Sequence, residues 1–330
     1  MMPTQSLVTL DELTVDVIAD NVSDMYVSKT TFARSEIDNV VKAGAAVISG
    51  TTLPVATHGL CLRLRAKSAG DEHSVLFDTG PEAAAFTRNC GQLKLDLGTV
   101  EDIAISHGHW DHTGALIAAI DAIIARRGRV TVHVNPGMFN ERGVRIADGR
   151  VVPFENVPAP DEMRSHGANV ANDPKARVLA DGHFYYSGEI PRVTSFEKGR
   201  PDHLCRPRDG GGEWRPDPLI LDERMLVAHV RGLGLIVFSA CSHAGIVNVC
   251  TEARARFPDV PIHAVMGGLH LCGAMERLIP DSVEALGQFD IRYIICAHCT
   301  GWRALHALAD AYGDRISQSA VGTTYWFGAS

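Results

Sequence analysis

Short apolar runs that end in polar turn residues recur along the chain and predict alternating strands and helices. We expect strands at 13–19, 58–65, 74–77, 103–105, 130–134, 177–179, 183–187, 225–230, 233–239, 261–266 and 291–296. We expect helices at 81–90, 113–127, 245–257, 281–289 and 302–312. This alternation is typical of α/β proteins, in which chemistry gathers where strands end.

Turn residues support several of these boundaries. Gly128 suits the C-cap of the helix at 113–127, and Ser68-Ala69-Gly70-Asp71 predicts a hairpin turn. The segment 22–57 is polar and irregular, and we interpret it as an N-terminal extension. The segment from about 140 to 224 is the least regular, and we interpret it as an insertion. No boundary separates a second domain, so we expect a single domain over 1–330.

Composition narrows the functional classes. The chain is 45% hydrophobic, which is ordinary for a globular protein, and its formal charge is −8. We find no basic stripe with interleaved aromatic residues, which disfavours a nucleic-acid binder. No run approaches the roughly 20 apolar residues of a membrane span. The 8 cysteines are spread along the chain, so we expect reduced thiols and a cytoplasmic location.

Four metal-capable side chains lie within six residues directly after the strand at 103–105. They are His107, His109, Asp111 and His112. Histidines at i and i+2 of an extended loop point the same way and can share one metal, and the Asp-His pair can reach a second. Imidazole and carboxylate ligands favour zinc first, then iron or manganese. The sequence therefore predicts one or two divalent metal ions.

Three later strands each deliver a histidine at the carboxyl end: His243, His270 and His298. His270 is equally compatible with contacting substrate, binding metal or capping its loop. The Asp78-Thr79-Gly80 turn is either structural or holds a ligand histidine through its carboxylate. We expect the remaining histidines at 73, 166, 203 and 306 to be surface or structural residues.

Taken together, these motifs resemble the metallo-β-lactamase superfamily, and most closely its dihydropterin ribofuranosylaminobenzene phosphate synthase-like branch. The motifs are Asp20-Asn21, His58-Gly59-Leu60, Phe77 to Gly80, Ser106 to Leu116, Ser187 to Arg192, Cys241 to Ile246, Gly267 to Leu271 and His298 to Gly301. The resemblance covers roughly residues 12 to 327 and implies a four-layer αββα sandwich with a metal site along one edge.

The resemblance also implies roles for single residues. His107 and His109 would bind the first metal, Asp111 and His112 the second, and His243 and His298 match later ligands. A bridging aspartate is usual in the superfamily, and Cys241 or His243 stands in its place here. Glu189 is a weak substitute for a histidine that many members carry upstream. Asn21 and His58 are expected near the pocket, as substrate or outer-shell residues, on resemblance alone.

The expected activity is that of a metal-dependent hydrolase acting on an ester-type or phosphoester-type small molecule through a metal-activated water. Asp111 and His270 are the expected catalytic residues, with Asp111 able to orient the water or accept its proton. One alternative is a transferase that condenses a reduced pterin diphosphate with a ribofuranosylaminobenzene phosphate. Another is a non-catalytic ligand-sensing protein. The only partner expected is a small molecule, and a homo-oligomer is left open.

Overall fold

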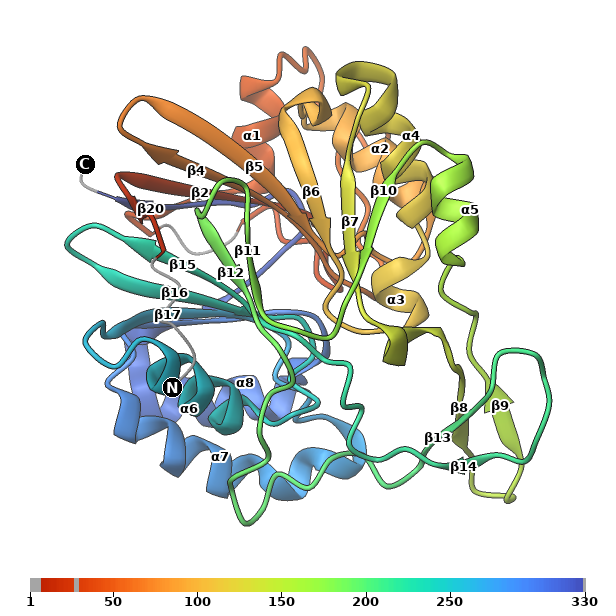
Figure 1. The fold of residues 1–330 in the computed structure, drawn as a ribbon. Coiled ribbons are helices and arrows are strands. Elements are labelled where there is room, and N and C mark those ends of the chain that lie inside the picture. Colours follow the sequence, from red (N-terminus) through yellow and green to blue (C-terminus); the bar gives the residue numbers. More distant parts are fainter. Residues whose placement is uncertain (1–6, 27–29, 329–330) are drawn as a thin grey trace.

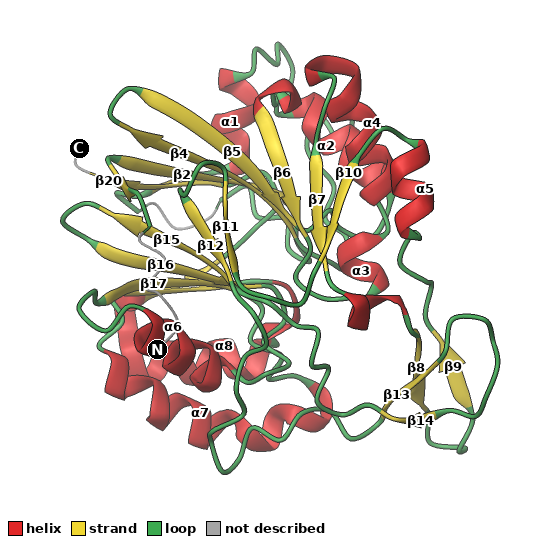
Figure 2. Ribbon diagram, in the orientation of Figure 1, coloured by secondary structure: helices red, strands yellow, loops and turns green. Residues whose placement is uncertain are grey.

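Two β-sheets pack face to face in the computed structural model, which describes residues 7–26 and 30–328 (Figures 1 and 2). The first sheet has the spatial order β10 (Asn169–Asn172), β7 (Thr131–Val134), β6 (Val100–Ala104), β5 (Asp71–Phe77), β4 (Cys61–Ser68), β2 (Glu12–Ala19), β20 (Thr324–Gly328) and β3 (Ala33–Arg34). The second has the order β11 (Arg177–Leu179), β12 (Phe184–Tyr186), β15 (Leu226–Val230), β16 (Gly234–Ser239), β17 (Ile262–Gly267), β18 (Tyr293–Cys296) and β19 (Ile316–Gln318), and β1 (Thr9–Leu10) pairs with β15.

Helices cover the outer side of both sheets. The helices of the described residues are α1 (Glu36–Lys42), α2 (Ala83–Gln92), α3 (Trp110–Thr113), α4 (Leu116–Arg127), α5 (Pro160–Ser165), α6 (Ile246–Arg256), α7 (Ile279–Leu286) and α8 (Trp302–Tyr312), of which the one-turn α3 lies at the edge of the sheets. Figure 1 shows α2, α4 and α5 on the side of the first sheet and α6, α7 and α8 on the side of the second. The helix α4 ends at Gly128, whose φ of 77° allows the left-handed C-cap that the sequence predicts. Short 3₁₀ turns occur at Leu97–Thr99, Pro136–Phe139, Gly273–Leu278, Gly287–Phe289, His298–Thr300 and Gly313–Arg315.

The core lies in three layers that follow from strand alternation. Inward-facing residues of both sheets, such as Phe77 and Phe238, form one fully buried cluster between the sheets. A second cluster joins the second sheet to α6, α7 and α8, and a third joins the first sheet to α2 and α4. Because each sheet buries both faces over these strands, the strands read as continuous apolar runs. The expected four-layer αββα architecture is confirmed.

Parallel pairing brings the functional loops to one edge. Strands β5, β6 and β7 are mutually parallel, and β16, β17, β18 and β19 are parallel in the other sheet. The carboxyl ends of parallel strands meet at the same edge, so the loops after β5, β6, β16, β17 and β18 come together. This places every histidine motif of the sequence in one region.

The middle of the chain is more regular than the sequence indicates. Within 140–224, β10 extends the first sheet beside β7, and β11 and β12 extend the second beside β15. A separate small sheet has the order β14 (Arg215–Pro216), β13 (His203–Arg206), β8 (Glu141–Arg145) and β9 (Val151–Pro153), and it projects from the sandwich in Figure 1. The strands β11 and β12 match those expected at 177–179 and 183–187, whereas β8, β9, β10, β13 and β14 are not among the expected strands, because each is only two to five residues long and shows little alternation.

The N-terminal extension expected at 22–57 is packed into the domain. It carries α1, and its strand β3 pairs with β20, so it completes the edge of the first sheet. The strand β20, absent from our expected strands, lies between β2 and β3. Among the described residues, no helix has both the length and the apolarity needed to cross a bilayer.

We predict that Phe238→Ala lowers the free energy of unfolding by about 3–5 kcal/mol, because Phe238 is fully buried between the sheets and its removal leaves a cavity. Urea unfolding followed by circular dichroism measures the change. The matched control is Val193→Ala, since Val193 is 63% exposed and should change stability little. Equal effects of the two substitutions would contradict this account of the core.

Candidate metal centre

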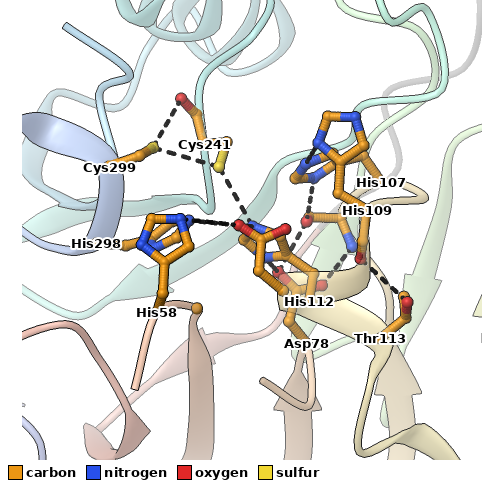
Figure 3. Close-up of polar contacts among 12 residues, drawn as sticks. His58, Asp78, His107, His109, His112, Thr113, Cys241, His298 and Cys299 are labelled. Atoms are coloured by element: carbon orange, nitrogen blue, oxygen red, sulfur yellow. Dashed lines mark hydrogen bonds and ion pairs between the residues drawn. The ribbon is translucent and has the colours of Figure 1, made fainter. Parts of the chain in front are cut away.

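Ligand-type side chains from both sheets converge at the edge where the parallel strands end (Figure 3). The loop after β6 supplies His107, His109, Asp111 and His112, the loop after β16 supplies Cys241 and His243, and the turn after β18 supplies His298. We call these seven residues the donor cluster. All of them are buried, with exposed fractions of 8% or less. Burying so many polar groups is costly unless they are paired or bind a cation.

Three ring nitrogens form one half of the donor cluster. His107 Nε2 lies 3.0 Å from His109 Nδ1 and 3.2 Å from His243 Nε2. His107 Nε2 therefore faces both a nitrogen of its own loop and a nitrogen from a loop of the other sheet. Three imidazole nitrogens around one position are a common ligand set for zinc.

Asp111, His112 and His298 form the other half. Asp111 Oδ2 lies 3.3 Å from His298 Nε2 and 3.8 Å from His112 Nε2. Cys241 Sγ lies 3.2 Å from His112 Nε2. A carboxylate, two imidazoles and a thiol thus face a second shared position.

Cys241 lies between the two halves. Its Sγ is grouped within 4.8 Å with the nitrogens of His107 and His243, and equally with those of His112 and His298. It also lies 3.2 Å from Cys299 Sγ, and both cysteines are buried. The thiol of Cys241 can therefore contact a metal ion bound by the histidines of either half.

The outer nitrogens of the ligand histidines are held by hydrogen-bond acceptors. Asp78 Oδ2 accepts from His112 Nδ1 at 2.7 Å and from Ser106 Oγ at 2.7 Å. Ser106 Oγ in turn accepts from His107 Nδ1 at 2.8 Å. Because the Nδ1 atoms of His107 and His112 donate to these acceptors, their Nε2 atoms face the cluster. Asp78 is therefore an orienting residue for two histidines.

The same logic applies to His109 and His298. The Asp217 carbonyl accepts from His203 Nδ1 at 2.8 Å, so His203 Nε2 is free to accept from His109 Nε2 at 2.9 Å. This leaves the Nδ1 lone pair of His109 pointing at His107. In His298, Nδ1 donates to Asn21 Oδ1 at 2.9 Å, which leaves Nε2 facing Asp111. Two acceptor atoms that face each other in a buried site require a proton or a cation between them.

His58 has the opposite tautomer. Its Nδ1 accepts from Asn21 Nδ2 at 3.1 Å, so its Nε2 carries the proton and points to Asp111 Oδ2 at 3.5 Å. We therefore exclude His58 from the ligand set, although it lies beside Asp111 and His298. Its geometry suits a donor that holds the Asp111 carboxylate.

The electrostatics of the donor cluster suit a cation. Burial lowers the pKa of His107, His109 and His243 well below the usual histidine value. Burial alone would lower the pKa of His112 too, but Asp111 and Asp78 raise it to about 9. Burial would raise the pKa of Asp111, but the neighbouring charge on His112 outweighs it and holds that pKa well below the usual range. Metal binding at His112 must therefore release a proton.

Two buried carboxylates position the ligand loops. Asp222 accepts from the backbone N–H of Gly108 at 2.9 Å and pairs with the buried guanidinium of Arg142. Glu223 accepts from the backbone N–H groups of His243 at 2.7 Å and Ala244 at 2.6 Å. Adjacent residues of one segment thus hold a loop from each sheet.

Gly59 is required by the close approach of two loops. A Cβ atom at position 59 would lie 2.2 Å from the carbonyl oxygen of Asp111. The next residue, Leu60, donates its backbone N–H to the same oxygen at 3.3 Å. The His58-Gly59-Leu60 motif therefore contacts the Asp111 loop through its backbone.

A pocket of about 330 Å³ opens beside the donor cluster. His109, Asp111, Cys241, His243 and His298 lie on its wall together with His58, Trp110, Phe154, Arg200, Asp202, His270, Cys272, Gly273, Ala274, Met275 and Cys299. Its volume suits a small molecule.

The structure brings together most of the residues that the sequence singled out. His270 lies on the pocket wall with its ring centroid 4.5 Å from that of His243. Glu189 is exposed and is absent from the pocket lining, so it does not take the place of an upstream histidine. The expectation for His203 needs refinement, since it is fully buried and hydrogen-bonded to His109.

Sequence reasoning missed the orienting roles of His203, Asp222 and Glu223. No local motif surrounds them, and each acts on a residue at least 20 positions away. The one local signal is the run of three charged residues, Asp222-Glu223-Arg224, shortly before β15.

Comparison with known proteins agrees with this geometry. Residues 58–171, which include the His107 to His112 motif, match the family model of the metallo-beta-lactamase superfamily. This part of the chain is therefore similar to a metallo-beta-lactamase domain. The metallo-beta-lactamase fold implies binding of a divalent metal, and the residues of the donor cluster fit such an ion.

One curated relative is 7,8-dihydropterin-6-methyl-4-(beta-D-ribofuranosyl)-aminobenzene-5'-phosphate synthase from Methanocaldococcus jannaschii. It is 26% identical over 272 residues, which are 80% of this chain and 88% of the relative. These similarities support an enzymatic function for the metallo-beta-lactamase domain.

Solved structures share the fold. A metal-dependent hydrolase of the beta-lactamase superfamily aligns with a TM-score of 0.68 at 21% identity, covering 96% of this chain and 99% of that one. Unliganded yeast PDE1 aligns with a TM-score of 0.52 at 11% identity, covering 98% and 100%. At these identities the likeness concerns the fold alone.

We predict that Gly59→Ala destabilises the protein by about 1–3 kcal/mol, because the added methyl group collides with the Asp111 carbonyl. Thermal and urea unfolding measure the effect. Gly91→Ala is the matched control, since a Cβ atom there meets nothing within 4 Å and the position is helical. An unchanged or raised stability of Gly59→Ala would show that the two loops do not need this approach.

Proposed function

We propose that this protein is a metal-dependent hydrolase that cleaves an ester-type or phosphoester-type bond of a small molecule. In this proposal His107, His109 and His243 hold one divalent metal, and Asp111, His112 and His298 hold a second. The observation that carries it is the orientation of the histidines, since each of the outer nitrogens of His107, His109, His112 and His298 has a hydrogen-bond partner. A set of lone pairs turned inward is what a cation site requires.

Cys241 completes the second half of this site. A thiolate beside two imidazoles and a carboxylate favours zinc over harder cations such as magnesium. When bound, a divalent metal acidifies water and stabilises negative charge that develops on a carbonyl or phosphoryl oxygen. We therefore assign Cys241 as the replacement for the usual bridging aspartate.

The residues of the chain contribute binding and proton handling. His58 donates its Nε2 proton toward Asp111, which keeps one carboxylate oxygen fixed near the pocket. We assign His270 to proton transfer, because its ring lies on the pocket wall and its Nδ1 has no hydrogen-bond partner among the described residues. Arg200 pairs with Asp202 at 3.0 Å. It is the one arginine or lysine among the residues that line the pocket, so we assign it to binding an anionic group of the substrate.

Transfer to a second substrate is the second candidate. It is favoured by the 26% identity to the curated synthase over 88% of that protein. Hydrolysis and transfer share the metal site and differ in the acceptor, which is water in the first and an aminobenzene in the second.

The decisive experiment measures the metal content of the protein and then identifies the molecule that accepts the cleaved group. Elemental analysis of the purified protein comes first, followed by assays of phosphodiesters, phosphomonoesters, lactones and thioesters in water enriched in heavy oxygen. Incorporation of the heavy isotope into the product supports hydrolysis. Pyrophosphate release that requires both a pterin diphosphate and a ribofuranosylaminobenzene phosphate supports transfer instead. A protein that holds no metal and shows no turnover when zinc, iron or manganese is added would overturn both.

We predict that Cys241→Ala weakens binding at the second half of the site, whereas Cys241→Asp retains metal because a carboxylate restores the negative ligand. Cobalt substitution reports this directly, since the thiolate-to-cobalt absorption band should disappear in both variants while cobalt content falls only in Cys241→Ala. Cys299→Ala is the control, because Cys299 is buried beside Cys241 but lies outside the proposed ligand set. A band that persists in Cys241→Ala would refute the assignment.

We also predict that Asp78→Asn lowers metal affinity by about 10–100-fold, because the orienting acceptor of His112 and Ser106 loses its charge. Competition with a chelating dye measures the affinity. Asp102→Asn provides a matched control, since Asp102 also accepts from a histidine, His133 at 3.0 Å, and from a backbone N–H, that of Ala180. Equal affinities of the two variants would argue against an orienting role for Asp78.

A further inference from the structure

A second cavity lies on the outer face of the first sheet, away from the donor cluster. It has a volume of about 520 Å³ and shares no lining residue with the pocket beside the donor cluster. We call it the outer-face cavity. Its walls are Asp16, Arg34, Asn39, Lys42, Ala43, Arg63, Arg65, Leu93, Lys94, Leu95, Thr324 and Trp326. Its size is in the range of small-molecule sites.

Strand alternation explains why this face is polar. On β4, Leu62 and Leu64 enter the core between the sheets, so Arg63 and Arg65 point to the opposite side. On β20, Tyr325 enters the same core, so its neighbours Thr324 and Trp326 face outward. The helices α2 and α4 cover the outer face over β5, β6 and β7 with an apolar cluster, but over β4, β2 and β20 that face is hollow.

The outer-face cavity is strongly basic in a chain whose formal charge is −8. Five cationic side chains line it, those of Arg34, Lys42, Arg63, Arg65 and Lys94, against one carboxylate, that of Asp16. Asp16 is already engaged, since Oδ2 lies 2.7 Å from Arg63 Nη2 and Oδ1 accepts from Thr324 at 2.9 Å. Among the described residues, no carboxylate lies within ion-pairing distance of Arg34, Lys42 or Lys94. Arg65 is also paired, with Asp16 at 3.5 Å and with Glu72 at 3.9 Å, so the uncompensated positive charge is that of Arg34, Lys42 and Lys94.

Helix ends explain only part of this charge. Lys42 is in the last turn of α1 and Lys94 directly follows the C-cap of α2, where cations offset the exposed carbonyl groups. That effect places one lysine at each helix, but it does not account for the three arginines that two strands, β3 and β4, direct into the same cavity. Lys94 also has a φ of 48°, at a position after a helix where glycine is favoured.

We propose that the outer-face cavity binds a phosphorylated small molecule. Phosphate oxygens accept from lysine and arginine donors, and several cations in one cavity favour more than one phosphate group. Leu93, Leu95 and Trp326 form an apolar part of the wall, and the Arg34 guanidinium lies 4.4 Å from the centre of the Trp326 ring. The ligand is either an inorganic polyphosphate or a nucleotide, because both carry this chemistry.

Calorimetric titration of the metal-loaded full chain with sodium tripolyphosphate and, separately, with ATP tests the proposal. The test variant is Lys42→Ala/Lys94→Gly, in which glycine retains the left-handed backbone at position 94 while removing the charge. Lys175→Ala/Arg150→Ala removes the same charge from exposed positions outside the cavity and is the matched control. We expect the test variant to bind at least about tenfold more weakly and the control to bind like the unmodified protein.

Comparison of the two titrations shows whether the cavity binds a nucleotide or an inorganic polyphosphate. Tighter binding of ATP than of tripolyphosphate, with a tryptophan fluorescence change that Trp326→Phe abolishes, identifies a nucleotide. Equal binding identifies phosphate groups alone. Because a metal at the donor cluster also binds phosphate, His107→Ala is titrated as well. Binding that His107→Ala abolishes and the lysine variant retains would overturn the proposal, as would no binding at all.

Discussion

A buried imidazole offers a lone pair to a cation from one nitrogen when the proton is kept on the other, and hydrogen-bond acceptors fix this tautomer for four of the five histidines of the donor cluster. Asp78, Asn21 and the His203–Asp217 pair supply the acceptors, and they come from four separate segments. Each acceptor must itself be buried and correctly placed, so the two sheets must pack in one register before the histidines point inward. The sandwich fold and the donor cluster are therefore parts of one arrangement.

Strained backbone angles and a buried carboxyl group occur in the loops that position the histidines. Ser242, His270 and His298 adopt positive φ angles of 56°, 45° and 45°, although none is glycine. Such strain persists where surrounding contacts over-determine the backbone, and it clusters at functional sites. Glu223 is fully buried, and burial raises the pKa of its carboxyl, yet it accepts two backbone N–H groups that hold the His243 loop.

Cys241 makes this centre different from one built on a bridging aspartate. Its thiol lies between the two halves of the donor cluster and beside a second buried thiol, that of Cys299. A thiolate is a softer ligand than a carboxylate, so in the proposed site the metal preference would depend on this position. The outer-face cavity, by contrast, is formed by outward-facing residues of the first sheet, and it shares no lining residue with the pocket beside the donor cluster.

The sequence by itself determined the elements with strong periodicity and the ligands that follow them in short motifs. The strands β2, β6, β16 and β17, the helices α4, α6 and α8, and the spacing of His107, His109, Asp111 and His112 all follow from neighbours within a few residues. Only the tertiary structure decided that β20 lies beside β2, that His243 joins His107, and that His203 and Glu223 orient them. These contacts join residues 20 to about 310 positions apart, and nothing local marks them, because their energy comes from burial that exists only once the sheets have met.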